Sequence, residues 1–344
     1  MSERVFPRCV LFGGSGFIGT HLAGHLLASG KAEEVWLADF RPTAMTTWPR
    51  QLQEAQIRGR VHCVTIDVRR SIVHADLPQH VDLIVNLAAV HREPGHEPEE
   101  YFATNLPGAE NICTWAEGIG CQTIIFTSSI APYGPTEEEK DETSLPVPIS
   151  PYGASKLVAE KIHLSWQRAE QGRQLLIVRP GVVFGPGEGG NVTRMIRAVC
   201  GRYFFYMGNR QTRKAGGYVK ELCYALTWML QWQQNNNVLM ALFNFSMDPA
   251  PTMEEYVQAI CCVANIQRFV PNIPYPLLLS LSYPIEALSR PLAIHQPINP
   301  VRIRKLIRST NVIPRFLRSH GYSYQYTLEQ ALRDWLQERP EEWR

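Results

Sequence analysis

The sequence predicts an α/β protein in which a doubly wound parallel sheet is followed by a smaller, mostly helical C-terminal lobe. In the first half, short apolar runs alternate with helix-like segments, as in parallel strands joined by crossover helices. A glycine-rich turn separates the first strand from the first helix. After Arg179-Pro180 the pattern changes to loops and separate helices. We therefore expect a first domain at 1–180 and a substrate lobe at 181–344, from which some segments can return to the first domain.

Each expected strand is a short apolar run bounded by turn residues, and it is apolar throughout because helices cover both faces of such a sheet. The strands are expected at 9–12, 35–38, 61–66, 81–87, 123–127 and 174–178. The helices between them are expected at 17–29, 99–118 and 152–171. Residues 181–190 are rich in Gly and Pro and should form a loop. Later helical patterns lie at 192–200, 219–232, 253–264 and 328–337.

Composition narrows the class of protein. Apolar residues make up 45% of the chain and charged residues 19%, which is typical of a globular protein. The formal net charge of +2 gives no basis for nucleic-acid binding. The eight cysteines are scattered and lack histidine partners at ligand spacing, so we expect neither a metal site nor a disulfide framework. Free thiols and an N-terminus without a long apolar stretch favour the cytoplasm.

The only candidate for a membrane span is the apolar stretch at 273–293. Pro274, Glu286 and Arg290 are among the residues that interrupt it, whereas a spanning helix needs about 20 mainly apolar residues. We therefore expect no transmembrane span. A segment that lies on a surface or lines a pocket remains an alternative.

The glycine-rich turn has the features of a dinucleotide site. Gly13 permits a tight turn, Gly16 lets the backbone approach a pyrophosphate, and Gly19 allows the helix to pack closely on the strand. The N-terminus of the helix then offers free N–H groups to the phosphates. The turn therefore predicts a Rossmann-type sheet that binds a dinucleotide. The intervening residues Ser15, Phe17 and Ile18 are expected to contact it as well.

Asp39 ends the second strand, 20 residues after Gly19. A carboxylate there accepts hydrogen bonds from the adenosine ribose and repels a 2′-phosphate, which favours NAD over NADP. Arg41 lies close by and could serve a 2′-phosphate instead. Asp67 and Val68 follow the third strand, where the adenine edge would lie. Leu87, Ala88 and Ala89 end the fourth strand, where the dinucleotide would run along the sheet.

Tyr152 and Lys156 are four residues apart and therefore share one face of a helix. A nearby ammonium stabilises phenolate, so the pKa of the tyrosine falls from about 10 toward neutrality. Such a tyrosine can exchange a proton with an alcohol or a ketone. The hydroxyls of Thr127, Ser128 and Ser129 follow the fifth strand, where one of them could polarise the reacting oxygen. Alternatively, these hydroxyls only cap a loop.

Five motifs in this order resemble the extended short-chain dehydrogenase/reductase family, in its nucleotide-sugar epimerase/dehydratase branch. They are Gly13-Gly-Ser-Gly-Phe-Ile-Gly19, Asn86-Leu-Ala-Ala89, Ser128-Ser-Ile-Ala-Pro-Tyr-Gly134, Ser150-Pro-Tyr-Gly-Ala-Ser-Lys156 and Val178-Arg-Pro-Gly-Val-Val-Phe-Gly-Pro-Gly187. The resemblance covers residues 9–190 and implies NAD as the cofactor. It implies Ser129 as the catalytic serine, Tyr152 as acid and base, and Lys156 as the residue that holds the nicotinamide ribose. It also implies that Asn105 supports the active-site helix on the cofactor side.

The C-terminal half matches the family weakly, and it departs from it at Lys220 or Glu221, at one of which an Asp is more usual. The resemblance implies that Asn191 meets a substrate diphosphate. Arg213 and Lys214 could neutralise the same phosphates, or they could belong to a solvated basic loop.

The leading interpretation is an NAD-dependent nucleotide-sugar epimerase, with a UDP-sugar as substrate, that serves the synthesis of polysaccharide or glycoconjugate precursors. Tyr152 would take the C4 hydroxyl proton while the C4 hydride passes to NAD, and the hydride would return to the other face of the rotated 4-keto intermediate. A second interpretation is a net NAD(P)-dependent dehydrogenase or reductase acting on a keto-sugar or on a hydroxysteroid-like apolar alcohol. A non-catalytic NAD-binding scaffold comes third, because the chain keeps Tyr152 and Lys156. We also expect a homodimer.

Overall fold

The computed structural model describes residues 5–91, 95–277, 279–280 and 308–344. Its main feature is a seven-stranded parallel sheet, in the order β11-β7-β5-β4-β1-β2-β3. The strands are β1 (Arg8–Phe12), β2 (Glu34–Asp39), β3 (Val61–Thr65), β4 (Leu83–Asn86), β5 (Thr123–Thr127), β7 (Gln174–Pro180) and β11 (Met240–Phe245). The predicted doubly wound parallel sheet is thus confirmed.

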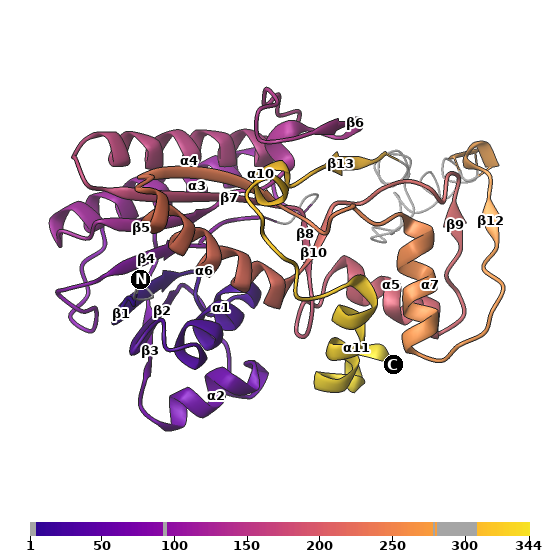
Figure 1. Ribbon diagram of the computed structural model, residues 1–344, viewed down its shortest axis with the longest axis horizontal. Coiled ribbons are helices and arrows are strands. Elements are labelled where there is room, and N and C mark those ends of the chain that lie inside the picture. Colours follow the sequence, from indigo (N-terminus) through magenta and orange to yellow (C-terminus); the bar gives the residue numbers. More distant parts are fainter. Residues whose placement is uncertain (1–4, 92–94, 278, 281–307) are drawn as a thin grey trace.

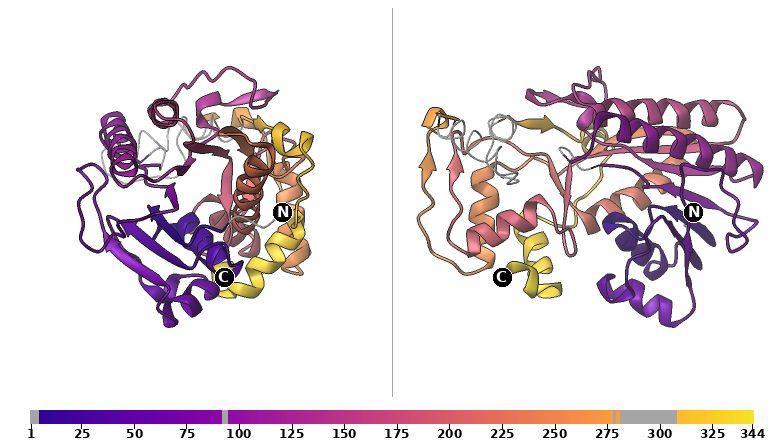
Figure 2. Two further views of the ribbon diagram at one scale, coloured as in Figure 1. Left: turned by 60° about the vertical axis from the view of Figure 1, so that its left-hand side comes forward. Right: turned by 180° about the vertical axis from the view of Figure 1, so that it is seen from behind.

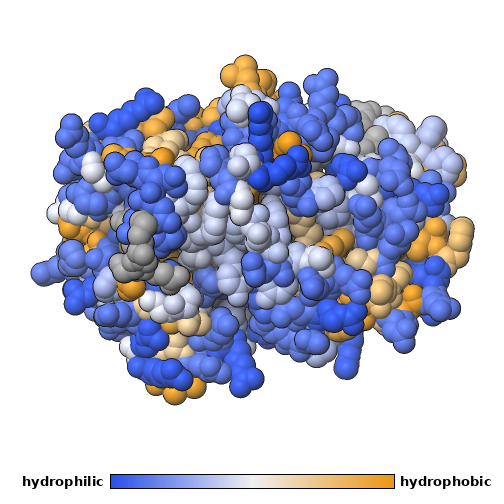
Figure 3. Space-filling view, viewed as in Figure 1, coloured by the Kyte–Doolittle hydropathy of each residue, from blue (hydrophilic) through white to orange (hydrophobic). Residues whose placement is uncertain are grey.

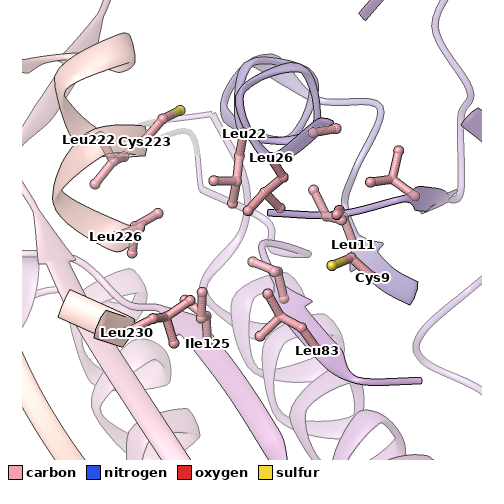
Figure 4. Close-up of a cluster of buried hydrophobic side chains, with 14 of the residues drawn as sticks. Cys9, Leu11, Leu22, Leu26, Leu83, Ile125, Leu222, Cys223, Leu226 and Leu230 are labelled. Atoms are coloured by element: carbon pink, nitrogen blue, oxygen red, sulfur yellow. The ribbon is translucent and has the colours of Figure 1, made fainter. Parts of the chain in front are cut away.

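Helices cover both faces of this sheet, as Figures 1 and 2 show. On one face lie α1 (Phe17–Ala28), α2 (Arg50–Ile57) and α6 (Val219–Asn236). The other face is covered by α3 (Pro98–Gly118) and α4 (Pro151–Arg168). Figure 4 shows Leu22 and Leu26 of α1 in one cluster with Leu226 of α6 and with the sheet residues Leu11 and Ile125. Burial of these side chains away from water fixes both helices on the sheet.

The structure has several elements that the sequence analysis did not predict, among them two strands that lie next to β7 in the chain or in the sheet. Residues 182–184, expected to be loop, form the short strand β8 (Val182–Phe184), which pairs with β10 (Gly216–Tyr218). Three apolar residues between glycines are too short a run to predict a strand. No strand was expected at 240–245, yet β11 extends the main sheet next to β7. Its apolar run follows the long helix α6, whose C-cap residue Asn237 has a φ of +52°.

Most of the remaining elements, apart from three short ones within residues 1–180, belong to the lobe. Its helices are α5 (Asn191–Cys200), α7 (Met253–Val263), α10 (Arg315–Ser319) and α11 (Leu328–Glu338). Two small strand pairs join β9 (Tyr206–Met207) to β12 (Asn272–Ile273), and β6 (Thr136–Lys140) to β13 (Thr310–Val312). Single 3₁₀ turns occur at η1 (Met45–Thr47), η2 (Ala131–Tyr133) and η4 (Pro340–Trp343). The expected helices of the lobe are thus found, with bounds shifted by a few residues at most.

Within the described residues, none of the helices combines the length and the apolar character that a bilayer crossing requires. Most of the apolar stretch at 273–293 lies outside the described residues. No group of His, Cys, Asp and Glu side chains that could hold a metal ion occurs in the part of the chain that the structure describes.

Candidate active site

Parallel strands direct their carboxyl ends to one edge of the sheet, and most of the predicted site residues lie along that edge. The glycine turn follows β1 there. A Cβ atom on Gly13, whose φ is +74°, would lie 2.8 Å from the backbone nitrogen of Ala88. A Cβ atom on Gly19 would lie 2.5 Å from the carbonyl oxygen of Gly14. Larger residues at these positions would therefore push the turn away from both the sheet and α1.

The turn is shaped to accept a polar ligand. The side-chain oxygen of Ser15 is buried and has no hydrogen-bond partner among the described residues. Gly16, the N-cap of α1, provides no side-chain cap for the first N–H groups of the helix. These two features leave donors at the place where a dinucleotide pyrophosphate binds in such folds.

Asp39 lies beside this turn, at the end of β2. Its carboxylate accepts hydrogen bonds from the backbone nitrogens of Ser15, at 3.2 Å, and Arg41, at 3.1 Å. Burial raises the pKa of Asp39, and these hydrogen bonds oppose that shift. The guanidinium of Arg41 instead lies over the Phe40 ring, 5.7 Å from its centroid. The acid is therefore fixed at the turn by backbone groups.

The segments after β3 and β4 are also held in place. The carboxylate of Asp67 pairs with Arg69 at 2.7 Å, so a contact from that carboxylate to adenine stays a prediction. The carbonyl of Val68 accepts a hydrogen bond from Asn111 of α3. After β4, the nitrogen of Ala88 donates to the Asn86 side chain at 3.1 Å.

Asn105 joins three parts of the site. Its amide donates to the Ser155 hydroxyl of α4 at 2.9 Å and to the carbonyl of Val90 at 3.2 Å. Its side-chain oxygen accepts from the nitrogen of Val90 at 2.9 Å. Asn105 thus ties α3 and the segment after β4 to the helix that carries Tyr152 and Lys156.

Lys156 is buried in the body of the site. Its ammonium donates to the carbonyl of Thr127 at 2.7 Å and lies 4.9 Å from the centroid of the Phe126 ring. Burial lowers the pKa of Lys156 to about 8, and the negative charge of Glu160 opposes that shift. The side-chain oxygen of Thr127 is also buried and lacks a partner among the described residues.

A close backbone contact brings the segments of Ser129 and Tyr152 together, and we call this part of the site the corner. A Cβ atom on Gly153 would lie 2.7 Å from the carbonyl oxygen of Ala131, so the start of α4 packs directly on the segment after β5. The Ser129 hydroxyl accepts a hydrogen bond from the Ala131 nitrogen at 3.1 Å. The half-buried Tyr152 ring lies 5.9 Å from the ring of Tyr101.

Behind this corner lies a buried polar network that the sequence analysis missed. Glu160 accepts two hydrogen bonds from Arg179, at 2.8 and 2.6 Å, and one from the Ser128 hydroxyl at 2.5 Å. Arg179 also donates to the Tyr133 hydroxyl at 2.7 Å, which donates to Asn244 at 3.0 Å. The ends of β5, β7 and β11 are thereby joined to α4. A signal existed in the sequence: Glu160 lies one helical turn beyond Lys156, and Arg179 interrupts an apolar strand.

The proposed substrate residues are less closely grouped. Asn191 is exposed at the start of α5, where its side chain accepts from Arg194 at 2.6 Å. Arg213 donates to the carbonyl of Ala250 at 2.6 Å. Lys214 donates to the carbonyl of Arg308 at 2.5 Å, and burial lowers its pKa to about 8. Both cations thus have partners within the lobe, and their contact with a substrate stays a prediction.

Lys220 and Glu221, at one of which the sequence departs from the family pattern, hold the C-terminal segment. Lys220 pairs with Asp334 at 2.6 Å and with Glu338 at 2.7 Å, both on α11. The carboxylate of Glu221 accepts hydrogen bonds from the Tyr322 hydroxyl and from the backbone nitrogens of Gln325 and Tyr326. These contacts give both residues a structural role.

Comparisons with known proteins agree with this geometry. The sequence model of the NAD dependent epimerase/dehydratase family matches residues 9–241. A protein of Escherichia coli O157:H7, N-acetyl-alpha-D-glucosaminyl-diphospho-ditrans,octacis-undecaprenol 4-epimerase, is 29% identical over 95% of this chain and 94% of its own length. The UDP-glucose 4-epimerase of Lacticaseibacillus casei is 30% identical, over 53% of each chain. The structure of the UDP-glucuronic acid 4-epimerase from Bacillus cereus in complex with NAD superposes with a TM-score of 0.72, at 17% identity, over 98% of this chain and 100% of that one.

Proposed function

The chain belongs to the NAD-dependent epimerase/dehydratase family, and we propose that it is a C4 epimerase of a sugar linked through a diphosphate, with a nucleotide sugar as the expected substrate. The observation that carries the proposal is the shared corner of the Tyr152, Lys156 and Ser129 segments, at the same sheet edge as the glycine turn.

The residues at the turn fit NAD. The Ser15 hydroxyl and the first N–H groups of α1 would bind the pyrophosphate, and Asp39 would accept the adenosine ribose hydroxyls. The remaining proposed contacts are Gly13, Gly16, Phe17, Ile18, Gly19, Asp67, Val68, Leu87, Ala88, Ala89 and Asn105. When bound, NAD supplies the acceptor and the donor of the C4 hydride.

The side chains around the reacting carbon move the proton. Tyr152 as phenolate takes the proton of the C4 hydroxyl, and it returns that proton when the C4 oxygen is reduced again. The Lys156 ammonium stabilises the phenolate, and the Ser129 hydroxyl donates to the reacting oxygen. Since the hydride and the proton both return to the sugar, the net reaction is an isomerisation.

A lipid-linked diphosphate is the second candidate for the carrier of the sugar. The name of the Escherichia coli relative places its sugar on undecaprenol diphosphate, and the alignment spans nearly the whole of both chains. The relative named for UDP-glucose aligns over only half of this chain. Nucleotide and lipid carriers share the diphosphate, for which Asn191, Arg213 and Lys214 are the proposed contacts.

The test is to incubate the enzyme with UDP-hexoses, with UDP-N-acetylhexosamines and with polyprenol-diphosphate-linked N-acetylhexosamine. C4 epimers should interconvert without a lasting change in NADH absorbance. NADH that accumulates mole for mole with product would instead indicate a net dehydrogenase. Oxidation of an apolar alcohol, without activity on any of these sugars, would favour the hydroxysteroid-like alternative.

Two further expectations are proposals about the whole protein. We propose a homodimer in the cytoplasm, for which light scattering on the purified protein and fractionation of cells are the measurements. We also propose that residues 1–180 carry the cofactor and catalytic residues and that 181–344 bind the substrate, although β11 and α6 belong to the main sheet and its cover.

A further inference from the structure

Apolar side chains are exposed at the end of the lobe farthest from the main sheet. We call residues 201–210 and 265–277 the lobe tip; β9 and β12 pair within it. On the tip, Phe269 is 87% exposed, Tyr203 66% and Leu277 50%. Figure 3 shows hydrophobic atoms at the right-hand edge of the molecule, over β9 and β12. Two of these three side chains are aromatic, although the interiors of such domains usually bury aromatic rings.

The backbone that presents these rings is anchored. The guanidinium of Arg268 donates to the carbonyl of Val199 at 2.9 Å and to that of Phe204 at 2.7 Å. Phe269 therefore follows a residue that is fixed to the end of α5. A Cβ atom on Gly201 would lie 2.7 Å from the Tyr203 ring, which shows that this ring rests against the turn. The exposed rings of Phe269 and Tyr203 are thus held in place by the surrounding backbone.

The segments around the tip carry mainly positive charge. No Asp or Glu occurs at 189–220 or at 256–285, although the chain has 32 acidic residues among 344. The first of these segments contains the exposed Arg194 and Arg197 on α5, and Arg202 and Arg210 on the tip. Arg210 reaches Glu254 at 3.2 Å, at the start of α7. The tip therefore combines exposed rings with excess positive charge.

We propose that the lobe tip docks on an anionic lipid bilayer. Tyr and Phe side chains partition into the boundary between headgroups and acyl chains, and guanidinium groups bind lipid phosphates. An anionic surface also attracts the positively charged segments that flank the rings. A protein partner would be expected to offer carboxylates of its own to these arginines, whereas a second copy of this chain carries no Asp or Glu at 201–210 or 265–277.

The position of the tip suits a substrate carried by a lipid, so this inference rests on the proposed function in its lipid-carrier form. Helix α5 runs from Asn191, the proposed diphosphate contact, to Cys200 at the tip. At 1.5 Å per residue its ten residues span about 15 Å. A diphosphate held at the start of α5 would therefore lie within reach of a bilayer that touches the tip.

The experiment measures sedimentation of the full chain, saturated with NAD, with sucrose-loaded vesicles of phosphatidylcholine, with or without phosphatidylglycerol. Wild type should bind the anionic vesicles more tightly. Phe269→Ser should weaken that binding at least about tenfold, because an apolar ring no longer enters the boundary. Val73→Ser is the matched control, because Val73 is 89% exposed in the segment between β3 and β4, at the other end of the molecule. Unchanged affinity for NAD shows that each variant is folded.

Absence of vesicle binding by wild type, or equal binding by wild type and Phe269→Ser, would overturn the proposal. It would also fail if light scattering showed a dimer that Phe269→Ser dissociates, without vesicle binding, because the tip would then face a second copy. Vesicle binding needs no sugar and no turnover. A failed epimerase assay with intact vesicle binding would therefore count against the proposed function alone.

Discussion

Tyr152 lies one helical turn before a buried lysine, and the phenol oxygen is the only group that its replacement by phenylalanine removes. We expect Tyr152→Phe to bind NAD as wild type does and to lower kcat about 10²–10⁴-fold, which is the usual contribution of a general acid–base group. Tyr101→Phe is the control, since its ring lies 5.9 Å from that of Tyr152, on a different helix. Retention of more than about a tenth of the wild-type kcat would assign the proton transfer to another residue.

Asp39 should set the choice between the two nicotinamide cofactors. Its carboxylate is fixed by the backbone nitrogens of Ser15 and Arg41, so a 2′-phosphate would meet a negative charge that cannot move away easily. Calorimetric titration should therefore show tighter binding of NAD than of NADP, and Asp39→Asn should narrow the difference. Tighter binding of NADP by wild type would mean that the Arg41 guanidinium governs this pocket.

Among the helices and strands, those with a strong local sequence pattern could be predicted from the sequence. The strands β1, β2, β3, β4, β5 and β7 are apolar runs in a protein whose helices cover both faces of the sheet. Ser129, Tyr152 and Lys156 lie in motifs with fixed spacing. The charges of Glu160 and Arg179 stand out in the sequence, but their pairing depends on α4 packing against β7, and no local pattern predicts such a tertiary contact.

Replacement of Glu160 tests this network, because Glu160 joins α4 to β7 through Arg179 and also affects the pKa of Lys156. Glu160→Gln would leave the Arg179 guanidinium buried with a weaker partner, so we expect a loss of about 3–5 kcal/mol in the free energy of unfolding. Glu160 also raises the pKa of Lys156, so its neutralisation should lower that pKa below about 8. Lys156 is protonated below its pKa and neutral above it, so the alkaline fall in kcat/KM should move to lower pH.

Urea unfolding and the pH profile of kcat/KM measure these two effects separately. The control is Glu170→Gln, which removes a carboxylate that is 53% exposed and paired with Arg173. That change should alter stability by about 0–1 kcal/mol and leave the pH profile as it is. A destabilised Glu160→Gln variant with an unshifted profile would limit Glu160 to a purely structural role.

At the scale of the whole molecule, the C-terminal helix joins the lobe to the sheet domain. Trp335 of α11 stacks on Phe184 of β8, with ring centroids 6.3 Å apart, while Lys220 of α6 binds two carboxylates of the same helix. The side chains of Lys220, Asp334 and Glu338 are 23–31% exposed, so the burial of this ion triad is intermediate between that of a surface pair and that of a buried pair. A single lysine thus connects a cover helix of the sheet to the core of the lobe.

Lys220→Met should therefore loosen the lobe more than the sheet. Asp334 and Glu338 would be left facing each other without their cation, and we expect a loss of roughly 1–3 kcal/mol in the free energy of unfolding. Trypsin should cut the segment at 315–344 faster, and KM should rise more than kcat falls, because the proton-transfer residues lie on the sheet side. Arg333→Met is the control, because Arg333 pairs with Glu329 within α11 and, among the described residues, forms no ion pair with another element. Equal digestion of both variants would show that aromatic packing around Trp335, and not the ion triad, fastens the lobe.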